Sequence, residues 1–339
     1  MTIRSLVKRL VLRGSLAERR TRANAARDVV HGKDGWLFLR AGSANVLDQH
    51  TGRRAMPPAD ADAWRTALAE RAAWAAERGV AYRAIFVPDS HAVYRDMLPD
   101  DIVAQLIPHE RRPLPAMIAS LAQEPAAAVL YPLDALVAAR ARGETFQRGD
   151  THWTEYGAWI VYQALKETLG DGLPIDWIAE ERVRFHARSE WGDLGSKFDP
   201  PRMTQCLRAE IAGADAACVY DNNVRNNGSL RVYRRAEPGA GCRCVVFADS
   251  FARNIERFLV NTFAETILVH SSRRLDYGFA DALRPDLVLT LGVERFAIEP
   301  PQDRMGQSLA AVIAAKRAAG AVAGPPEGSW DWPEALEAG

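Results

Sequence analysis

The sequence predicts an α/β protein in which helices cover a parallel β-sheet. Short apolar runs of strand length alternate with longer stretches rich in Ala, Leu and Arg that have helical character. The chain has 339 residues, of which 48% are hydrophobic, enough for one large domain. The expected strands are 84–87, 128–131, 244–247, 266–269 and 286–291, and the expected helices are 59–78, 110–122, 154–169, 251–263 and 303–319.

The chain divides into a main domain with a short segment at each end. We expect a basic amphipathic helix over 1–28, the α/β domain over 29–323 and an irregular tail over 324–339. Between about 171 and 241 the alternation breaks down, which indicates an insertion made of loops and short strands; long insertions often border a site. The first helix is typical either of attachment to an anionic membrane surface or of packing against its own domain.

Composition excludes several classes of function. Lys and Arg number 43, Asp and Glu also number 43, and the pI is about 7.1, so no net field favours nucleic acid as a partner. No stretch predicts a membrane span or a cleavable signal peptide, which taken alone favours a cytoplasmic or membrane-peripheral location. The cysteines lack the spacing of a zinc site, although one disulfide is possible in an oxidising compartment. They are Cys206, Cys218, Cys242 and Cys244.

A serine follows the expected strand at 244–247. Ser250 comes directly after Asp249 in the run VVFADSFARN. Ligands of parallel sheets bind beyond the carboxyl ends of the strands, so its hydroxyl is expected at the sheet edge. Its own N–H, at the start of a helix, would face an oxyanion. Alternatively, Asp249 or Ser250 simply caps the helix.

A second polar motif precedes the expected helix at 154–169. A nucleophilic serine needs an imidazole to take its proton, and the imidazole needs an acid to fix its tautomer. Asp150 and His152 meet this need if the loop turns the carboxylate back toward the ring, with Thr151 as the spacer. The alternatives are half of a metal site, or a helix cap made by Asp150 or Thr154.

Other polar residues also follow the expected strands. Asp89 and His91 form another acid and histidine pair, but no third ligand is suggested, so we expect no metal and no cofactor. The run at 270–272, His-Ser-Ser, lies on the same predicted rim. Trp153, Trp159 and Trp191 could stack on sugar rings or belong to the core.

Six runs in this sequence resemble the SGNH-like alginate O-acetyltransferases of the AlgX and AlgJ type. The runs are GKDGWLFL at 32–39, VPDSHAVYRDMLP at 87–99, GDTHWTEYGA at 149–158, WGDLG at 191–195, ADSF at 248–251 and RPDLVLTLGVERF at 284–296. Read from Val245 to the C-terminus and then from the N-terminus to His152, the elements occur in SGNH order. The resemblance implies a flavodoxin-like, three-layer SGNH-type parallel sheet that is circularly permuted and carries an irregular insertion.

The resemblance also implies roles for single residues. Ser250 would be the nucleophile, His152 the general base and Asp150 its orienting acid. The D-x-H spacing, shorter than the SGNH D-x-x-H, favours the acetyltransferase branch. GVER at 292–295 replaces G-x-N-D, so the amide that helps to hold the oxyanion is missing, and an ionised glutamate cannot donate. Candidates for oxyanion or substrate contacts are Asn254, Arg253, Arg273, Arg295, Asp193 and Tyr156.

The resemblance therefore implies a serine-dependent O-acetyltransferase that acts on hydroxyls of an exopolysaccharide or another cell-surface glycan. The alternatives are a carbohydrate esterase with the same triad, and a non-catalytic carbohydrate-binding subunit of a polysaccharide-modification complex. Expected partners are a polysaccharide acceptor and a membrane-bound acyl-donor protein. The resemblance implies a periplasmic location, whereas the lack of a predicted signal peptide favours a cytoplasmic or membrane-peripheral one.

Overall fold

The structure is a computed structural model that describes residues 27–170, 172–237, 241–271, 274–304 and 306–330. The basic amphipathic helix expected over 1–28 lies almost wholly outside the described residues, so it stays a prediction. The division of the chain into a main domain and two end segments also stays a prediction.

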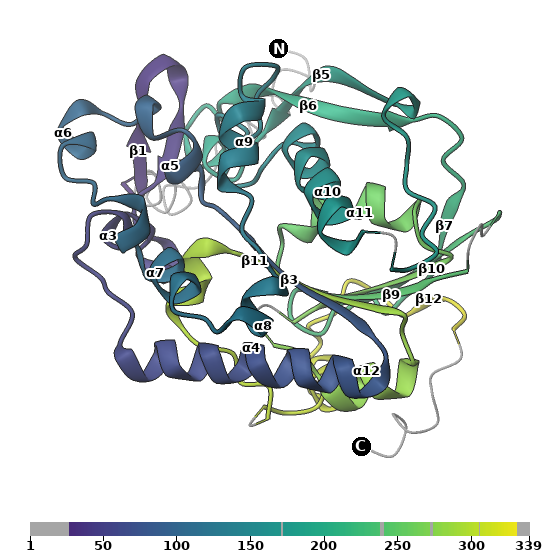
Figure 1. The fold of residues 1–339 in the computed structure, drawn as a ribbon. Helices are drawn as coiled ribbons and strands as arrows, with labels where there is room; N and C mark the ends of the chain where they lie inside the picture. The colour runs from purple at the N-terminus through teal and green to yellow at the C-terminus, as the bar shows by residue number, and fades with distance from the viewer. Residues whose placement is uncertain (1–26, 171, 238–240, 272–273, 305, 331–339) are drawn as a thin grey trace, which may run out of the picture.

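One eight-stranded sheet forms the centre of the molecule (Figure 1). Its order is β12-β7-β8-β10-β9-β11-β3-β4; the five strands from β10 to β4 are parallel, and β8, β7 and β12 extend the sheet by antiparallel pairing. The strands of this sheet are β3 (Ala81–Val87), β4 (Val129–Leu130), β7 (Ala216–Asp221), β8 (Leu230–Arg235), β9 (Arg243–Ala248), β10 (Glu265–His270), β11 (Leu287–Val293) and β12 (Glu327–Gly328). The two small antiparallel pairs are β1 (Val29–His31) with β2 (Leu37–Leu39), and β5 (Val183–Trp191) with β6 (Met203–Ile211).

The order of the parallel strands confirms the predicted circular permutation. Counted from β9, the chain runs through β10 and β11, and the count continues with β3 and β4 from the N-terminal half. Across the sheet these five strands then lie in the order 2-1-3-4-5, which is the flavodoxin-like order of doubly wound sheets. All five strands overlap the predicted ranges.

Helices cover both faces of the sheet, so the predicted three-layer α/β architecture is confirmed. In Figure 1, α4 and α12 lie on one face, and α10 and α11 lie on the other. The α-helices are α3 (Val46–His50), α4 (Pro58–Arg78), α5 (Ser90–Val93), α6 (Asp100–Val103), α7 (Pro113–Ala119), α8 (Gln123–Ala127), α9 (Leu133–Ala139), α10 (Glu155–Leu169), α11 (Ala252–Val260), α12 (Tyr277–Leu283) and α13 (Leu309–Ala318). The 3-10 helices are η1 (Lys33–Gly35), η2 (Gly42–Ala44), η3 (Arg95–Met97), η4 (His109–Arg111), η5 (Glu180–Arg182), η6 (Gly195–Lys197) and η7 (Glu294–Ile298).

Strand β9 shows why the sequence folds in this way. Successive side chains of a strand point to opposite faces, and both faces of a covered parallel sheet need apolar residues. Val246 and Ala248 pack in the core under α10 and α11, whereas Val245 and Phe247 pack in the core under α4 and α12. A continuous apolar run therefore serves both cores, and it brings Ser250 to the carboxyl edge of the sheet.

Two parts of the chain differ from the expectation. In the insertion, β5 and β6 are each nine residues long, so the prediction of short strands was wrong for this hairpin. In the predicted irregular tail, Glu327 and Gly328 pair with Asp221 and Tyr220 of β7, so this part is an edge strand. A two-residue strand beside a proline-rich run gives no periodicity that a sequence could reveal.

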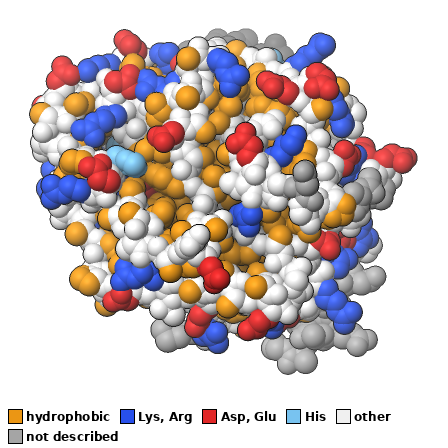
Figure 2. Space-filling model, viewed as in Figure 1, with side chains coloured by type: hydrophobic (Ala, Val, Ile, Leu, Met, Phe, Trp, Pro, Cys, Tyr) orange, Lys and Arg blue, Asp and Glu red, His pale blue; other side chains and the backbone are white. Residues whose placement is uncertain are grey.

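The surface seen in Figure 2 carries charges of both signs around a central area of hydrophobic side chains. This mixture agrees with the zero net charge of the chain. No helix among the described residues is both long and apolar enough to cross a membrane.

Two helix glycines make a test of local packing. At Gly157, in the first turn of α10, a Cβ would overlap the carbonyl oxygen of Thr145. At Gly278, in α12, a Cβ would lie 3.7 Å from Asp276 Oδ1, which is an ordinary contact. We expect Gly157→Ala to lower the free energy of unfolding by about 1–3 kcal/mol through overpacking. Gly278→Ala should raise it by about 0.5–1 kcal/mol, because alanine favours a helix. Urea denaturation of both variants checks this; a stabilising Gly157→Ala would contradict the packing described here.

Candidate active site

Ser250 lies in the turn between β9 and α11, and Asp249 fixes this turn. Asp249 Oδ1 accepts a hydrogen bond from Phe251 N at 2.8 Å, and Oδ2 accepts one from Val293 N at 2.8 Å. Burial raises the pKa of the Asp249 carboxyl. The N-cap of α11 is Phe251, without a side-chain cap, so neither Asp249 nor Ser250 caps this helix. Asp249 therefore ties the serine turn to the end of β11.

The structure brings Ser250, His152 and Asp150 together in a hydrogen-bonded chain. His152 Nε2 lies 2.8 Å from Ser250 Oγ, and His152 Nδ1 lies 2.6 Å from Asp150 Oδ1. A proton on Nδ1 satisfies the carboxylate and leaves Nε2 free to accept from the serine hydroxyl. This geometry can activate a serine as a nucleophile.

The spacing of one residue works because Asp150 folds back over its own loop. Asp150 Oδ1 also accepts from the backbone N–H of His152 at 2.8 Å, and Oδ2 accepts from Asp193 N at 2.9 Å. Burial opposes ionisation of Asp150, but the hydrogen bond and charge of His152, together with the two backbone N–H groups, outweigh it, so the pKa of Asp150 is lowered. Asp150 is not the helix cap that one alternative proposed; Thr154 caps α10 by accepting from Gly157 N at 3.0 Å.

Thr151 is more than a spacer, because it forms two hydrogen bonds with Asp193 from the insertion. Thr151 donates to the two carboxylate oxygens of Asp193, from its N–H at 2.8 Å and from its hydroxyl at 2.6 Å. Burial and the nearby Asp150 carboxylate raise the pKa of Asp193. The Asp193 carboxylate therefore supports the loop that carries His152, and its predicted contact with a substrate stays a prediction.

Aromatic and amide groups join the histidine loop to the serine turn. The His152 ring lies 4.8 Å from the Phe251 ring, centroid to centroid, and Trp153 Nε1 donates to Phe251 O at 2.9 Å. Asn254 is buried, and its amide donates to Trp153 O. Asn254 therefore holds the loop in this structure, and its predicted contact with an oxyanion or substrate stays a prediction.

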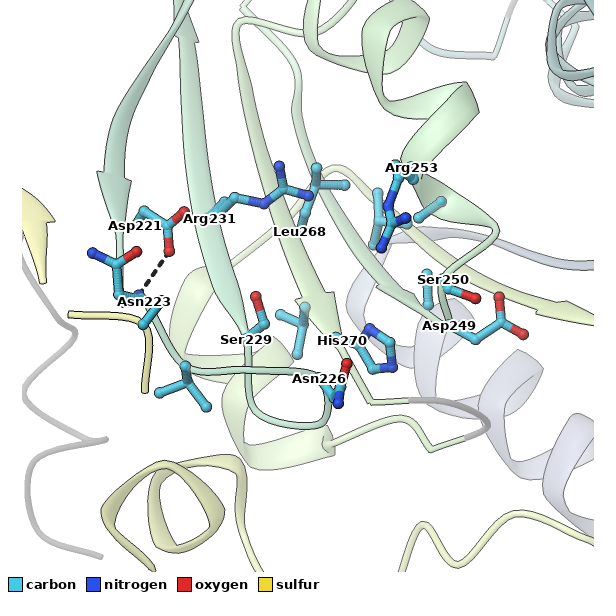
Figure 3. Close-up of a pocket in the computed structure, with 16 residues that line it drawn as sticks. Asp221, Asn223, Asn226, Ser229, Arg231, Asp249, Ser250, Arg253, Leu268 and His270 are labelled. Atoms are coloured by element: carbon cyan, nitrogen blue, oxygen red, sulfur yellow. Dashed lines mark hydrogen bonds between the residues drawn. The ribbon is translucent and has the colours of Figure 1, made fainter. Parts of the chain in front are cut away.

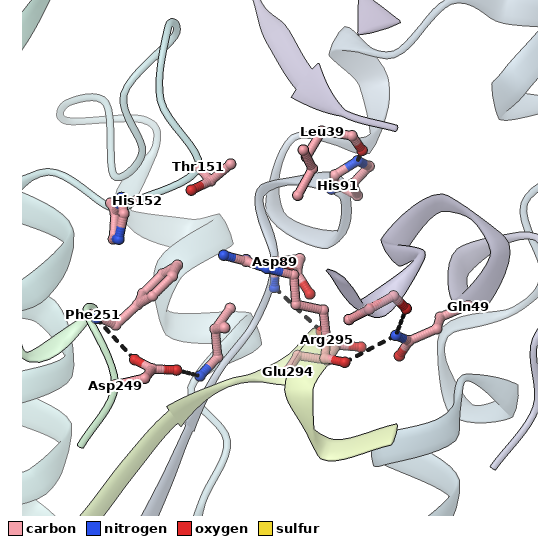
Figure 4. A network of polar contacts seen from close by, with 12 residues as sticks. Leu39, Gln49, Asp89, His91, Thr151, His152, Asp249, Phe251, Glu294 and Arg295 are labelled. Carbon is pink, nitrogen blue, oxygen red and sulfur yellow. Dashed lines mark hydrogen bonds and ion pairs between the residues drawn. The ribbon is translucent and has the colours of Figure 1, made fainter. Parts of the chain in front are cut away.

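Three other donors remain near the place where an oxyanion would form. Within the described part of the chain, no group accepts a hydrogen bond from Ser250 N–H. Arg253 lines the same pocket as Ser250. Arg295 lies over the Phe251 ring at 5.3 Å and is held by Asp89 Oδ1 at 2.5 Å (Figure 4). Arg273 lies outside the described residues.

Glu294 and Asp89 belong to a buried polar cluster behind Arg295. Glu294 pairs with Arg112 at 3.1 Å and accepts from Tyr131 Oη at 2.8 Å. Burial raises the pKa of Glu294, and burial lowers that of His91 to about 4. The cluster therefore positions Arg295 beside the serine turn.

Two groups of described residues have spacing that would suit a metal ion. They are His50 with Asp89 and Glu294, and Asp150 with His152 and Asp193. The expected pair Asp89 and His91 does not form such a group with a third ligand. In both groups the carboxylates already accept bonds from arginines, His152 or the backbone, as described above.

Tyr156 and most of the tryptophans named above belong to the core. Tyr156, Trp153 and Trp159 are buried, so they cannot stack on a sugar in this structure. Trp191 is 66% exposed, on the β5–β6 hairpin. The four cysteines are free thiols, so the possible disulfide is not present.

Sequence reasoning missed one wall of the pocket beside Ser250. It is built from the ends of β7, β8 and β10, and it includes His270, Asn226 and Ser229. His270 was noticed on the polar rim but was given no role. Asn226 and Ser229 lie in the insertion, where no motif or periodicity marks them.

Ser250 follows β9, which is the first strand in the 2-1-3-4-5 order, and a histidine and an acid lie beside it. This combination defines an SGNH-type α/β domain. Comparison with protein families gives the particular branch. A family model described as "SGNH hydrolase-like domain, acetyltransferase AlgX" matches residues 29–218. The chain therefore belongs to this family.

Solved structures with the same fold have little sequence in common with this chain. Bacillus cereus PatB1 with a sulfonyl adduct aligns with a TM-score of 0.58 at 13% identity, over 80% of this chain and 97% of the other. The O-acetyltransferase domain of Pseudomonas putida AlgJ aligns with 0.52 at 17% identity, over 86% and 99%. A DHHW family protein from Eubacterium siraeum aligns with 0.50 at 16% identity, over 67% and 85%. A search of curated proteins found no match.

The support that Asp193 gives to the histidine loop can be tested with p-nitrophenyl acetate, a simple ester. Asp193→Ala removes both acceptors of Thr151, so we expect the rate of ester cleavage to fall on the order of tenfold to a hundredfold through misplacement of His152. Asp193→Asn keeps the shape and one acceptor, so it should retain most of the rate. Equal rates in Asp193→Ala and the unaltered protein would contradict the supporting role.

Proposed function

We propose that the protein is an O-acetyltransferase that carries the acetyl group on Ser250 and passes it to a hydroxyl of a glycan. Membership of the acetyltransferase family supports the class of activity. The observation that carries the mechanism is the chain of contacts from Ser250 Oγ through the His152 ring to Asp150, at 2.8 and 2.6 Å.

In the first half-reaction Ser250 Oγ attacks the carbonyl carbon of the donor's acetyl group. The serine proton moves to His152 Nε2, and Asp150 stabilises the charged ring. The oxyanion is held by Ser250 N–H, with Arg253 and Arg295 as the nearby cationic donors. The bond to the leaving group breaks, and His152 returns the proton to that group. Acetyl-Ser250 results.

In the second half-reaction a hydroxyl of the acceptor attacks the acetyl carbon. His152 takes the hydroxyl proton, the bond to Ser250 Oγ breaks, and the proton returns to the serine. The acetyl ester now belongs to the acceptor, and no cofactor takes part in the balance.

The partners of this reaction are part of the proposal. The acceptor is a polysaccharide at the cell surface or outside the cell, and the donor is a membrane-bound acyl-donor protein. The basic segment over 1–28 would hold the enzyme at the membrane beside that donor. Under this proposal the enzyme itself lies in the periplasm, as the resemblance to the exported acetyltransferases implies.

Hydrolysis is the nearest competing activity, because water could take the place of the acceptor on the same triad. A non-catalytic glycan-binding subunit is the third reading, but such a subunit has no need for a serine held at hydrogen-bond distance from a supported histidine. The test below distinguishes the three.

The proposed chemistry is tested by incubating the protein with p-nitrophenyl acetate, alone and with an alginate oligomer, cellopentaose or chitopentaose. We expect acetyl on Ser250 by peptide mass spectrometry, and acetylated oligomer with at least one of the acceptors. His152→Asn should lower the rate of acetylation by about 10²-fold to 10⁴-fold through loss of the base. Ser250→Ala should abolish the adduct.

Each alternative gives a different result in this experiment. Free acetate as the product with every oligomer would identify an esterase. An unmodified Ser250, with identical behaviour of Ser250→Ala, would leave a binding subunit and contradict the enzyme.

A further inference from the structure

The two strands that flank β9 give Ser250 two different sides. On the β11 side lies Arg295, buried against Phe251 and bound to Asp89. On the β10 side a pocket of about 470 Å³ opens beside Ser250 (Figure 3). This volume falls in the range of small-molecule sites. The pocket is the side on which a second substrate could approach the serine.

Part of the pocket wall is already committed to contacts within the protein. Arg231 forms two hydrogen bonds with the Glu256 carboxylate, at 2.8 and 2.6 Å. Asn223 donates from its amide to Pro325 O at 2.6 Å, and its backbone N–H donates to Asp221 Oδ1 at 2.7 Å. These groups form a fixed frame.

Four other polar side chains face the pocket without such commitments. Within the described residues, no hydrogen bond or ion pair engages the side chains of Arg253, Asn226, Ser229 or His270. They come from α11, from the β7–β8 turn and from the end of β10. A polar wall of this kind, with unused donors and acceptors, suits a ligand rich in hydroxyl groups.

His270 has the best position among them for a role in the reaction. In the sheet it lies opposite Ala248, two residues before the nucleophile, and Ser271 N donates to Ala248 O at 3.0 Å. In Figure 3 its ring lies between Asn226 and Ser250. His270 and Ser250 therefore line the same pocket, with the ring on the side of the β7–β8 turn.

The surroundings of His270 favour its neutral form. Burial lowers the pKa of His270; Asp249 acts in the opposite direction, while Arg253, Lys316 and Arg231 lower it further. A neutral imidazole offers one donor and one acceptor, which matches the two functions of a sugar hydroxyl. It could bind one hydroxyl and direct a neighbouring one toward the acetyl group.

We propose that His270, with Asn226, forms the acceptor subsite, and that His270 binds hydroxyls of the glycan and so favours transfer of acetyl over hydrolysis. The inference rests on the proposed function, because it assigns the second half-reaction to this side of Ser250. His152 remains the base for both half-reactions; His270 is a binding and positioning residue.

The test measures the ratio of acetylated oligomer to free acetate, with p-nitrophenyl acetate as the donor and the oligomers named above as acceptors. We expect His270→Ala to lower this ratio about tenfold, as for the loss of one hydrogen bond, and to raise KM for the oligomer. His270→Asn keeps a donor and an acceptor and should recover part of the ratio. His186→Ala, which removes an exposed histidine from β5, is the matched control and should keep the ratio of the unaltered protein.

A second variant keeps the test valid if His270→Ala fails to fold. Asn226 has a positive φ of 55°, so Asn226→Gly removes its side chain while allowing the same backbone, and it should also lower the ratio. If acetyl-Ser250 forms but neither variant changes the ratio, the acceptor subsite is overturned and the proposed function stands. If the unaltered protein acetylates none of the oligomers and only releases acetate, it is an esterase, and both the proposed transfer to a glycan and the acceptor subsite are overturned. If no acetyl-Ser250 forms at all, both proposals fail.

Discussion

The Asp150 carboxylate is the interaction on which the candidate site depends. It accepts hydrogen bonds from the His152 ring and the His152 backbone, which fix the loop before α10. It also accepts one from the backbone of Asp193, which joins this loop to the insertion. An acid so close in sequence to its histidine can orient the ring only in this folded-back form. Asp193 completes the arrangement by holding Thr151, so the two acids act on neighbouring residues of one loop.

The permuted sheet explains how residues far apart in the sequence meet. β9 delivers Ser250 at the centre of the parallel strands, while the loop before α10 brings His152 over the same edge from the N-terminal half. Hydrogen bonds of Trp153 and Asn254 join the loop before α10 to the turn and helix that follow β9. The elements on the two sides of β9 then differ: η7, directly after β11, carries the buried Arg295, and β10 ends in His270, which lines an open pocket.

Much of this could be predicted from the sequence, for identifiable reasons. Buried parallel strands such as β9 leave long apolar runs, and the polar residues after them, Ser250 and His270 included, mark the binding edge. The motif at 150–152 alone allowed a catalytic pair, half of a metal site or a helix cap, and its catalytic interpretation came from the family resemblance of the six runs together.

The contacts that depend on tertiary structure could not be predicted. Asn254 was one of several candidates for an oxyanion or substrate contact, and its amide binds the Trp153 carbonyl, because helix periodicity does not say which neighbour an amide will meet. The β5–β6 hairpin and the edge strand at 327–328 depend on pairing partners distant in the sequence. The same holds for Asn226, which has no local signal and reaches the pocket only through the β7–β8 turn.

The mechanism depends on the activation of Ser250 by His152 and Asp150. Treatment with phenylmethanesulfonyl fluoride, followed by peptide mass spectrometry, tests it most directly, because the reagent attaches to activated serines. We expect a single sulfonyl group on Ser250, formed far more slowly in Asp150→Asn and undetectable in Ser250→Ala. Labelling of other serines at the same rate as Ser250, or an unchanged rate in Asp150→Asn, would contradict it.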